Sequence, residues 1–395
     1  MQALEGVKVL DLTHYVAGPY CTKIFAGLGA EVIKIEKPEC GDGSRKVGPF
    51  LRDEPDHETS ALFLYLNTGK KSIMLDLKAK TGIECFNKLV TDVDVVVENF
   101  RPGVMANLGI DYESLEKLNP GLVMTSISNC GQTGPYRDFK ADELVEYALS
   151  GLMYLTGDPD REPLKTGTLF TLYQTGVQAF VGTMVALLHK EETGVGQHVE
   201  VSILECSTFC MYNPLVNYFY RNTVVKRDGN RGFGRAAWGP YPCRDGYAGV
   251  VAGPEHRWPM LARLVEQPEL DSPRYRTPGA RVTLRDEIDA LMLPWLLEHD
   301  KHDIYHAAQA LGMTFAYVAT PKDMLESEQL KARQFFVDID HPRAGKLSYP
   351  GAPFVMSETP WQHGRAPMLG EHNDEVYSQW LGLTEDEVRG LMGQS

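Results

Sequence analysis

Residues 165–205 read KTGTLFTLYQTGVQAFVGTMVALLHKEETGVGQHVEVSILE, and the patterns in this stretch decide the fold class. TLFTLY (168–173) has the apolar and β-branched residues typical of a strand and leads into a long apolar helix. The helix ends at a Gly-rich turn, residues 192–197, and HVEVSIL (198–204) reads as a second strand. In α/β enzymes a strand that feeds a helix N-terminus often carries a reactive or anion-binding group. We therefore expect an α/β fold with a functional corner near residue 174.

The N-terminal residues repeat this strand–helix–strand order. VKVLDLT (7–13) reads as a buried strand, CTKIFAGLGA (21–30) as a helix and EVIKIE (31–36) as the next strand. This order predicts the opening of a parallel, Rossmann-like sheet. The loop between the first strand and the helix lacks the GxGxxG pattern, so a standard dinucleotide site is not predicted.

Further strands are predicted at SIMLDL (72–77), VDVVVENF (93–100) and LVMTSIS (122–128), with a helix over 81–92. Ligands of open α/β sheets bind at the carboxyl ends of the strands, which places Lys37, Asn99, Arg101 and Lys140 at one edge. Basic residues are frequent in this part of the chain, and as a group they indicate a ligand that carries phosphates. The set comprises Lys34, Lys37, Arg45, Lys46, Lys70, Lys71, Lys78, Arg101, Arg137 and Lys140.

Composition and charge restrict the class of protein. The 395 residues are 43% hydrophobic and 23% charged, as in soluble globular proteins, and suit one large and one smaller domain. No apolar run is long enough to span a membrane, and the N-terminal residues do not read as a signal peptide. A net charge of −14 disfavours nucleic-acid binding. The seven scattered cysteines contain no CxxC pair, so we expect no metal site and a cytoplasmic location.

A second domain is expected after about residue 220, where Gly, Pro, Arg and aromatic residues become frequent. We place the first part of the large domain at 1–224, a smaller α+β domain at 225–325 and a return to the large domain at 326–395. A hairpin is predicted at 334–351, and a capping box at Thr384 and Glu387 begins the last helix.

Several spaced motifs together resemble the family III CoA-transferases, which include formyl-CoA and carnitine CoA-transferases. The resemblance covers nearly the whole chain. It implies that the domain at 225–325 is inserted in the large one and that two subunits interlock like links of a chain. The segments that carry it are EGVKVLDLTHYVAGPYCTKIFAGLGAEVIKIEKP, GDGSR, NTGKKSIMLDLK, VVENFRPGV, NPGLVMTSIS, GQTGPY, ETGVGQHVEVSILE and RAPMLGEHNDEV.

The resemblance also implies a set of residues that contact coenzyme A. Lysines at these positions provide cations for phosphates, and the apolar members provide surface for adenine or the pantetheine arm. A phosphate-binding Arg of some relatives corresponds to Asn107, which removes one contact. The implied set is Val16, Lys37, Leu75, Lys78, Asn99, Phe100 and Lys140.

The residue that the resemblance implies as nucleophile is missing. Family members carry an Asp four residues before the Gly that corresponds to Gly176, and this chain has Leu172 there. No Asp or Glu lies between Glu162 and Glu191. In the family the carboxylate attacks the acyl-CoA thioester to form an anhydride, and the released thiolate returns to form an enzyme–CoA thioester. A hydroxyl would form an ester, which is too stable for the cycle, so neighbouring Thr and Tyr residues are no substitute.

Three interpretations remain open. In the first, the chain is the non-catalytic subunit of a heteromer whose homologous partner carries the Asp. This arrangement is similar to a two-subunit branch that moves CoA from succinyl-CoA to benzylsuccinate in anaerobic toluene degradation. In the second, the chain is a homodimeric transferase whose nucleophile is Asp142 or Glu143. In the third, it is a CoA-binding scaffold without catalysis. A final expectation concerns Phe209, Tyr212, Tyr218, Phe219 and Tyr220, which pack in a core or line an acyl pocket.

Overall fold

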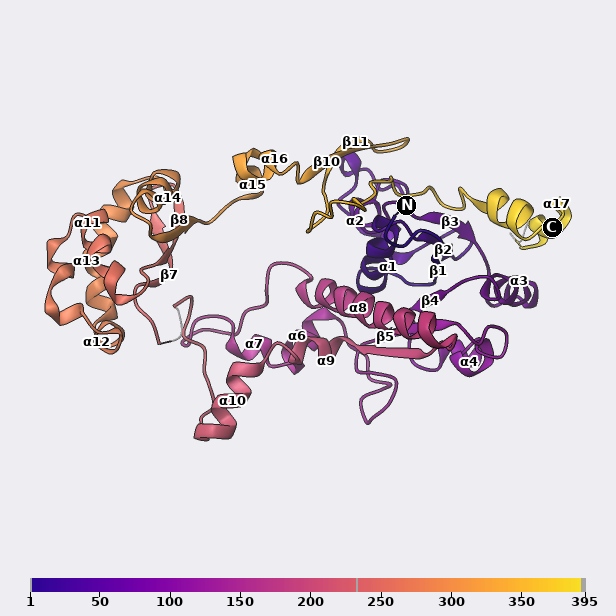
Figure 1. Ribbon diagram of the computed structural model, residues 1–395, viewed down its shortest axis with the longest axis horizontal. Coiled ribbons are helices and arrows are strands. Elements are labelled where there is room, and N and C mark those ends of the chain that lie inside the picture. The colour runs from indigo at the N-terminus through magenta and orange to yellow at the C-terminus, as the bar shows by residue number, and fades with distance from the viewer. Residues whose placement is uncertain (1, 232–233, 392–395) are drawn as a thin grey trace. The chain divides into compact units, whose positions relative to one another are not determined.

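The computed structural model describes residues 2–231 and 234–391, and these residues divide into two compact units (Figure 1). The larger unit comprises Met1–Leu152, Lys165–Leu215 and Lys331–Ser395, and the smaller one Met153–Leu164 and Val216–Leu330. The smaller unit includes residues 153–164, which the predicted boundaries at 225 and 325 leave out. They belong there because Arg227 donates hydrogen bonds to the backbone carbonyls of Tyr154 and Asp158.

The strands of the described chain form three sheets, and a parallel sheet of six strands is the centre of the larger unit. Its order is β3-β2-β1-β4-β5-β6, with Leu10 of β1 paired with Ile33 of β2 and with Val96 of β4. The predicted α/β fold with a parallel sheet is confirmed. The strands are β1 (Lys8–Asp11), β2 (Glu31–Glu36), β3 (Lys71–Met74), β4 (Val95–Glu98), β5 (Val123–Ser128) and β6 (His198–Ser202).

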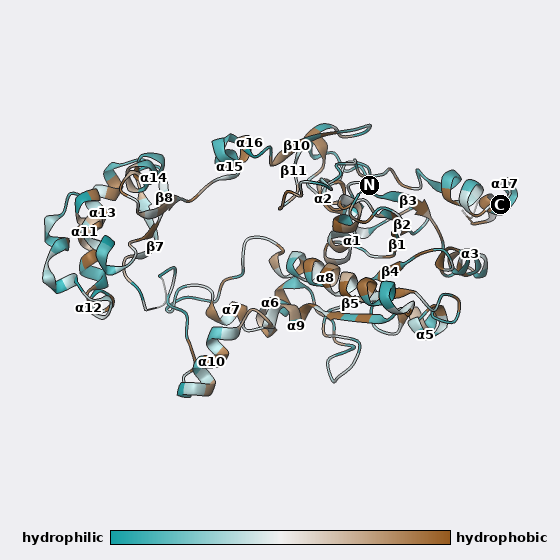
Figure 2. Ribbon diagram, in the orientation of Figure 1, coloured by the Kyte–Doolittle hydropathy of each residue, from teal (hydrophilic) through white to brown (hydrophobic). Residues whose placement is uncertain are grey.

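Helices cover both faces of this sheet, which explains why its strands are apolar along their whole length. Val9, Val95 and Val123 face helices α1 and α8, whereas Leu10, Val96 and Met124 face α3 to α5 and the C-terminal helices. Figure 2 shows the hydrophobic residues along these strands in brown. The helices are α1 (Ala17–Gly27), α2 (Ala61–Leu66), α3 (Lys80–Val90), α4 (Val104–Asn107), α5 (Tyr112–Leu115), α6 (Glu143–Leu149), α8 (Phe170–Thr193), α9 (Ile203–Thr208), η6 (Glu375–Trp380) and α17 (Glu385–Leu391).

Residues from Lys331 onward belong to the larger unit. An antiparallel hairpin, β10 (Phe336–His341) and β11 (Gly345–Pro350), packs through Ile339 and Tyr349 against Phe63 of α2. The predicted capping box precedes α17: the backbone N–H of Thr384 donates to the Glu387 carboxylate at 2.8 Å. Short 3₁₀ turns lie at Gly43–Lys46 and Leu51–Asp53.

The smaller unit is an antiparallel sheet of β7 (Trp238–Cys243), β8 (Gly246–Val251) and β9 (Thr314–Tyr317) packed against helices. Its core contains Trp258, Ile288, Met292 and Phe315. The helices are α11 (Trp258–Leu264), α12 (Pro278–Thr283), α13 (Arg285–Glu298), α14 (Lys301–Ala310) and α15 (Pro321–Glu326), with 3₁₀ turns at Glu255–Arg257, Pro268–Asp271 and Pro273–Tyr275. The boundaries between the two units fall inside three helices, α7 (Leu152–Leu155), α10 (Tyr212–Arg221) and α16 (Glu328–Ala332).

One local prediction is wrong. Residues 168–173 do not form a strand, because α8 already begins at Phe170 and continues to Thr193. The apolar residues of TLFTLY instead form the first turn of this helix, where Leu172 packs against the core beneath α1. Tertiary packing overrides the local strand propensity of Thr, Phe and Tyr. The helix ends as predicted, at Gly194 with φ of 75°, a left-handed cap that glycine adopts readily.

Candidate active site

The carboxyl ends of β1 and β4 lie side by side at the point where the strand order reverses. In open α/β sheets this is where ligands bind. The loops after these two strands are joined by Asn99, whose Oδ1 accepts the His14 N–H at 2.8 Å. Its Nδ2 donates to the His14 carbonyl, also at 2.8 Å. Tyr15, which follows His14, has a positive φ of 66°, and the chain turns there toward the N-terminus of α1.

The residues predicted to contact CoA lie along this edge of the sheet. Lys37 follows β2, Leu75 and Lys78 follow β3, Asn99 and Phe100 follow β4, and Lys140 lies in the loop after β5. Val16 and Leu75 are buried, and Phe100 packs partly against the core. Lys37, Lys78 and Lys140 are exposed, and no carboxylate in the described chain pairs with their ammonium groups. That these residues bind CoA stays a prediction.

Four residues of the predicted basic set already have protein carboxylates as partners, so a ligand phosphate is not needed to explain them. The side chains of Lys34, Arg45 and Lys70 are fully buried. Lys34 Nζ lies 2.8 Å from Asp42, Arg45 Nε 2.7 Å from Glu36 and Lys70 Nζ 2.9 Å from Asp11. Lys71 is half-exposed and lies 2.6 Å from both Glu31 and Glu375. The prediction that the basic residues as a group bind the phosphates of a ligand was wrong for these four residues.

The buried charges form one cluster beneath the loop that follows β1. Burial alone would raise the pKa of Asp11, but the charges of Lys34 and Lys70 and hydrogen bonds from Thr13 and Thr22 hold it well below its usual range. Burial lowers the pKa of Lys70 to about 8 in spite of its contact with Asp11. The cluster therefore holds the first turn of α1 in place.

The second turn of α8 lies close against the first turn of α1 at the corner that the sequence predicts to be functional. A Cβ on Gly176 would lie 2.6 Å from the carbonyl oxygen of Ala17, so the close approach requires glycine. One turn earlier, the rings of Tyr20 and Tyr173 meet edge to face with centroids 4.9 Å apart. Leu172, beside Tyr173, is partly buried and packs against the core cluster that contains Ala17 and Cys21 of α1.

The two predicted surrogate acids are both engaged. Asp142 is exposed and caps α6, since its Oδ1 accepts the Val145 N–H at 3.2 Å. Glu143 is buried, and its carboxylate lies 2.7 Å from Lys165 Nζ and 3.3 Å from Thr171 Oγ1. The contact with Thr171 brings Glu143 to the first turn of α8, next to Leu172. The ion pair with Lys165 was not predicted, because helices α6 and α7 separate the two residues along the chain.

A third acid in this region escaped the sequence analysis. Glu146 is buried, and neither carboxylate oxygen has a hydrogen-bond partner in the described chain. Burial, together with the charges of Asp142 and Glu143, raises its pKa to about 8. The position of Glu146 three residues after Glu143 on α6 was the available signal, because residues at that spacing share one side of a helix.

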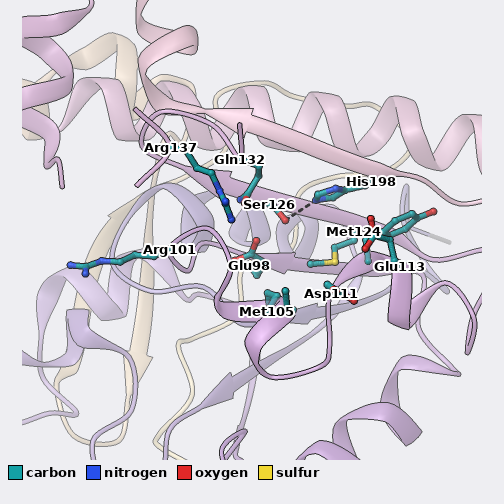
Figure 3. Close-up of a pocket in the computed structure, with 13 residues that line it drawn as sticks. Glu98, Arg101, Met105, Asp111, Glu113, Met124, Ser126, Gln132, Arg137 and His198 are labelled. Carbon is teal, nitrogen blue, oxygen red and sulfur yellow. Dashed lines mark hydrogen bonds between the residues drawn. The ribbon is translucent and has the colours of Figure 1, made fainter. Parts of the chain in front are cut away.

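A polar pocket on the other face of the sheet was also missed (Figure 3). Glu98 of β4 and Ser126 of β5 line it, and the Ser126 hydroxyl lies 2.9 Å from His198 Nε2 of β6. Glu98 ends a run of three valines in which alternate residues face α3 to α5. That alternation was the signal that a carboxyl group faces this side.

Comparisons with known sequences and structures agree with this α/β fold and identify the family. The sequence model of CoA-transferase family III matches residues 4–373. The chain belongs to CoA-transferase family III. It is 35% identical to formyl-CoA:oxalate CoA-transferase of Streptomyces coelicolor, over 99% of this chain and 98% of the relative. It is also 32% identical to subunit BbsE of the succinyl-CoA:(R)-benzylsuccinate CoA-transferase of Thauera aromatica, over 99% of this chain and 97% of the relative.

A solved structure supports the fold of this family III CoA-transferase. The crystal structure of a CAIB/BAIF family protein from Brucella suis superposes with a TM-score of 0.88 and 32% identity, covering 96% of this chain and 99% of that one. Transferases of the family take acyl-CoA as substrate and need no metal. In the described residues no cluster of His, Cys, Asp or Glu could hold a metal ion, and no helix has the length and apolar character needed to cross a membrane.

Proposed function

We propose that this transferase is the subunit of a two-subunit enzyme that leaves the covalent step to a homologous partner carrying the Asp. The observation that carries the proposal is Leu172, an apolar side chain at the corner formed by α1 and α8. An alkyl group cannot attack a thioester, and the chain offers no carboxylate between residues 162 and 191.

The nearest acids support this proposal because each has another role. Asp142 caps a helix, and Glu143 is held by Lys165. Glu146 is buried and its pKa is raised to about 8, so near neutral pH it is protonated and a poor nucleophile. The exposed lysines Lys37, Lys78 and Lys140 remain suited to the phosphates of CoA.

Exposed aromatic residues favour a partner chain. We expected these rings in a core or an acyl pocket, but between 52% and 84% of each side chain is exposed, on and just before α10. Large apolar side chains that stay exposed in one short segment often mark protein interfaces. We infer that a homologous subunit covers it in an interlocked dimer. The residues are Phe209, Tyr212, Tyr218, Phe219 and Tyr220.

We propose succinyl-CoA as donor and a benzylsuccinate-like acid as acceptor. The relative named as subunit BbsE belongs to an enzyme with this substrate pair, and its name indicates a further subunit. Other relatives of similar identity act on glutarate or oxalate, so the acceptor is tested directly by supplying each of the three acids.

The test is to trap the enzyme-bound acyl group. The purified assembly is incubated with succinyl-CoA and treated with hydroxylamine or borohydride, and both chains are digested for peptide mass spectrometry. The proposal predicts a modified carboxylate on the partner and none on this chain. A chain that purifies alone as an active homodimer would overturn it.

A second candidate is a homodimeric transferase that uses Glu143. The contact of 3.3 Å between Glu143 and Thr171 favours it, since it places the carboxylate beside the turn that carries Leu172. The same experiment separates the two, because here the modified peptide contains Glu143 and the label disappears in Glu143→Gln. An assembly that binds CoA but shows neither label nor turnover is the non-catalytic scaffold.

A further inference from the structure

The pocket bounded by Glu98, Ser126 and His198 adjoins the predicted CoA contacts Asn99 and Phe100, since the Phe100 N–H donates to Glu98. It lies along β4, β5 and β6 on the face that carries α4 and α5. Its volume is about 220 Å³, below the ~300–1,000 Å³ of pockets for drug-sized ligands. The pocket therefore suits a ligand of a few heavy atoms.

One end of the pocket is cationic. Arg137 comes from the loop after β5 and points into the pocket, whereas Arg101 points away (Figure 3). The Nε of Arg137 is buried and donates no hydrogen bond within the described chain. The carboxylate nearest to this Nε is that of Asp138, at 4.0 Å, beyond hydrogen-bond reach. The Arg137 side chain is 41% exposed overall, but its enclosed Nε lacks an acceptor, and a guanidinium in this state suits an anionic group.

The other end carries acids and hydrogen-bond acceptors. Glu98 is buried, and its Oε2 accepts the Phe100 N–H at 2.7 Å. Ser126 links Glu98 to His198, whose ring stacks on Tyr112 with centroids 5.5 Å apart. Asp111 and Glu113 lie on the α5 side, and the Oδ1 of Asp111 also caps that short helix. Met105 and Met124 supply apolar surface.

We propose that this pocket binds a small aminocarboxylate, with its carboxylate on Arg137 and its ammonium group among Glu98, Ser126 and Glu113. The distribution of charge selects this class. A dicarboxylate would bring a second anion to the acidic end, and a simple amine would leave Arg137 without an acceptor. Inorganic phosphate would meet the same repulsion as the dicarboxylate. The proposal does not depend on which subunit carries the nucleophile.

Binding is coupled to a proton on Glu98. Burial raises the pKa of this carboxyl to about 7 in the empty pocket, in spite of hydrogen bonds from Ser126 and the Phe100 N–H. An ammonium group beside it favours the ionised form, so the ligand releases a proton when it binds below pH 7. The other titratable groups that line the pocket are Arg101, Asp111, Tyr112, Glu113, Arg137 and His198.

The test is isothermal titration calorimetry of the full chain, assembled with its partner where it requires one. Glycine, β-alanine and 4-aminobutyrate are titrated at pH 6.5 in two buffers that differ in ionisation enthalpy. Succinate, butylamine and inorganic phosphate are the comparison probes. At least one aminocarboxylate is expected to bind at least tenfold more tightly than all three comparison probes and to release a proton.

The variants assign the binding to this pocket. Arg137→Gln removes the cation, and Glu98→Gln removes the titrating carboxyl while it keeps an acceptor for Phe100. Each is expected to weaken binding at least tenfold, and Glu98→Gln abolishes the proton release. The matched control is Arg333→Gln, an exposed arginine of the same unit, with binding unchanged. The proposal is overturned if no aminocarboxylate saturates or if Arg137→Gln binds as well as the wild type.

Discussion

A Cβ on Gly176 would lie 2.6 Å from the carbonyl oxygen of Ala17, so the second turn of α8 lies close against the first turn of α1. Gly176→Ala is therefore expected to push the two helices apart and to lower the free energy of unfolding by about 1–3 kcal/mol, the usual cost of overpacking. Urea unfolding measures this change. Gly167→Ala is the control, because nothing lies within 4 Å of its Cβ position. Equal urea midpoints for the two variants would show that the contact between α1 and α8 can accommodate the added methyl group.

Leu172→Asp is expected to give this chain the missing nucleophile. With acyl-CoA present, hydroxylamine should then modify residue 172, and peptide mass spectrometry detects the product. Loss of the Leu172 packing should lower the free energy of unfolding by roughly 2–3 kcal/mol. Leu172→Asn is the matched control and should stay unmodified. A folded Leu172→Asp variant that binds CoA but remains unlabelled would show that the corner is not where acyl transfer occurs.

Lys140→Gln is expected to weaken CoA binding about tenfold, because a hydrogen bond to a charged group contributes about 1.5 kcal/mol. The difference from wild type should shrink at high salt, since exposed charges are screened. Equilibrium dialysis at two salt concentrations measures both effects. Lys80→Gln serves as the control, because Lys80 is an exposed lysine of the same unit whose nearest carboxylate is Glu84 at 3.8 Å. An unchanged affinity for Lys140→Gln would remove this residue from the predicted CoA contacts.

Glu146→Gln is expected to stabilise the protein at alkaline pH. The pKa of Glu146 is raised to about 8, so between pH 4.5 and 8 the folded state keeps a proton that the unfolded state has lost. The stability of the wild type therefore falls as pH rises through this window, and the variant lacks this fall. The variant's advantage should grow by on the order of 2–3 kcal/mol between pH 6 and pH 9.

Unfolding curves at both pH values measure the growth of this advantage. Glu116→Gln, at a partly exposed glutamate of the same unit, provides the baseline. A constant difference between Glu146→Gln and wild type would mean that Glu146 is ionised throughout the range.

Asp11→Asn is expected to lower the free energy of unfolding by about 3–5 kcal/mol, because it leaves Lys70 buried without its carboxylate. The lowered pKa of Asp11 also means that its contribution is present above about pH 4 and is lost as pH falls further. Chemical unfolding at pH 7 and pH 3 measures both. Glu84→Gln breaks only an exposed pair and should change stability by less than ~0.5 kcal/mol. Similar values for the two variants would contradict a structural role for the cluster.

The sheet could be predicted from sequence because its strands are apolar on both faces, as in VVVE of β4. The positions of Lys37 and Asn99 at one edge of the sheet followed from the predicted strand ends, whereas Leu75 was named only because of the family resemblance. The partners of the lysines could not be predicted in the same way. Lys70 and Asp11 are 59 residues apart, and only the folded sheet shows that the lysine is buried against this carboxylate.

At the corner formed by α1 and α8, too, some features could be predicted from the sequence and others could not. Its glycine and its missing acid were visible in the sequence, whereas the first turn of α8 was assigned to a strand because its residues favour strands locally. Helices α6 and α7 separate Glu143 from Lys165 along the chain, so their pairing depends on the tertiary fold. Such long-range contacts decide which acids are free to react.

The two hydrogen bonds between Asn99 and the backbone of His14 have a consequence for the kinetics of ligand binding. They join the loops that follow β1 and β4 before any ligand arrives, so little conformational entropy would be lost in ordering these two loops around a ligand. A pre-organised crevice allows association by collision rather than after a slow rearrangement, and differences in affinity among ligands then lie mainly in their dissociation rates.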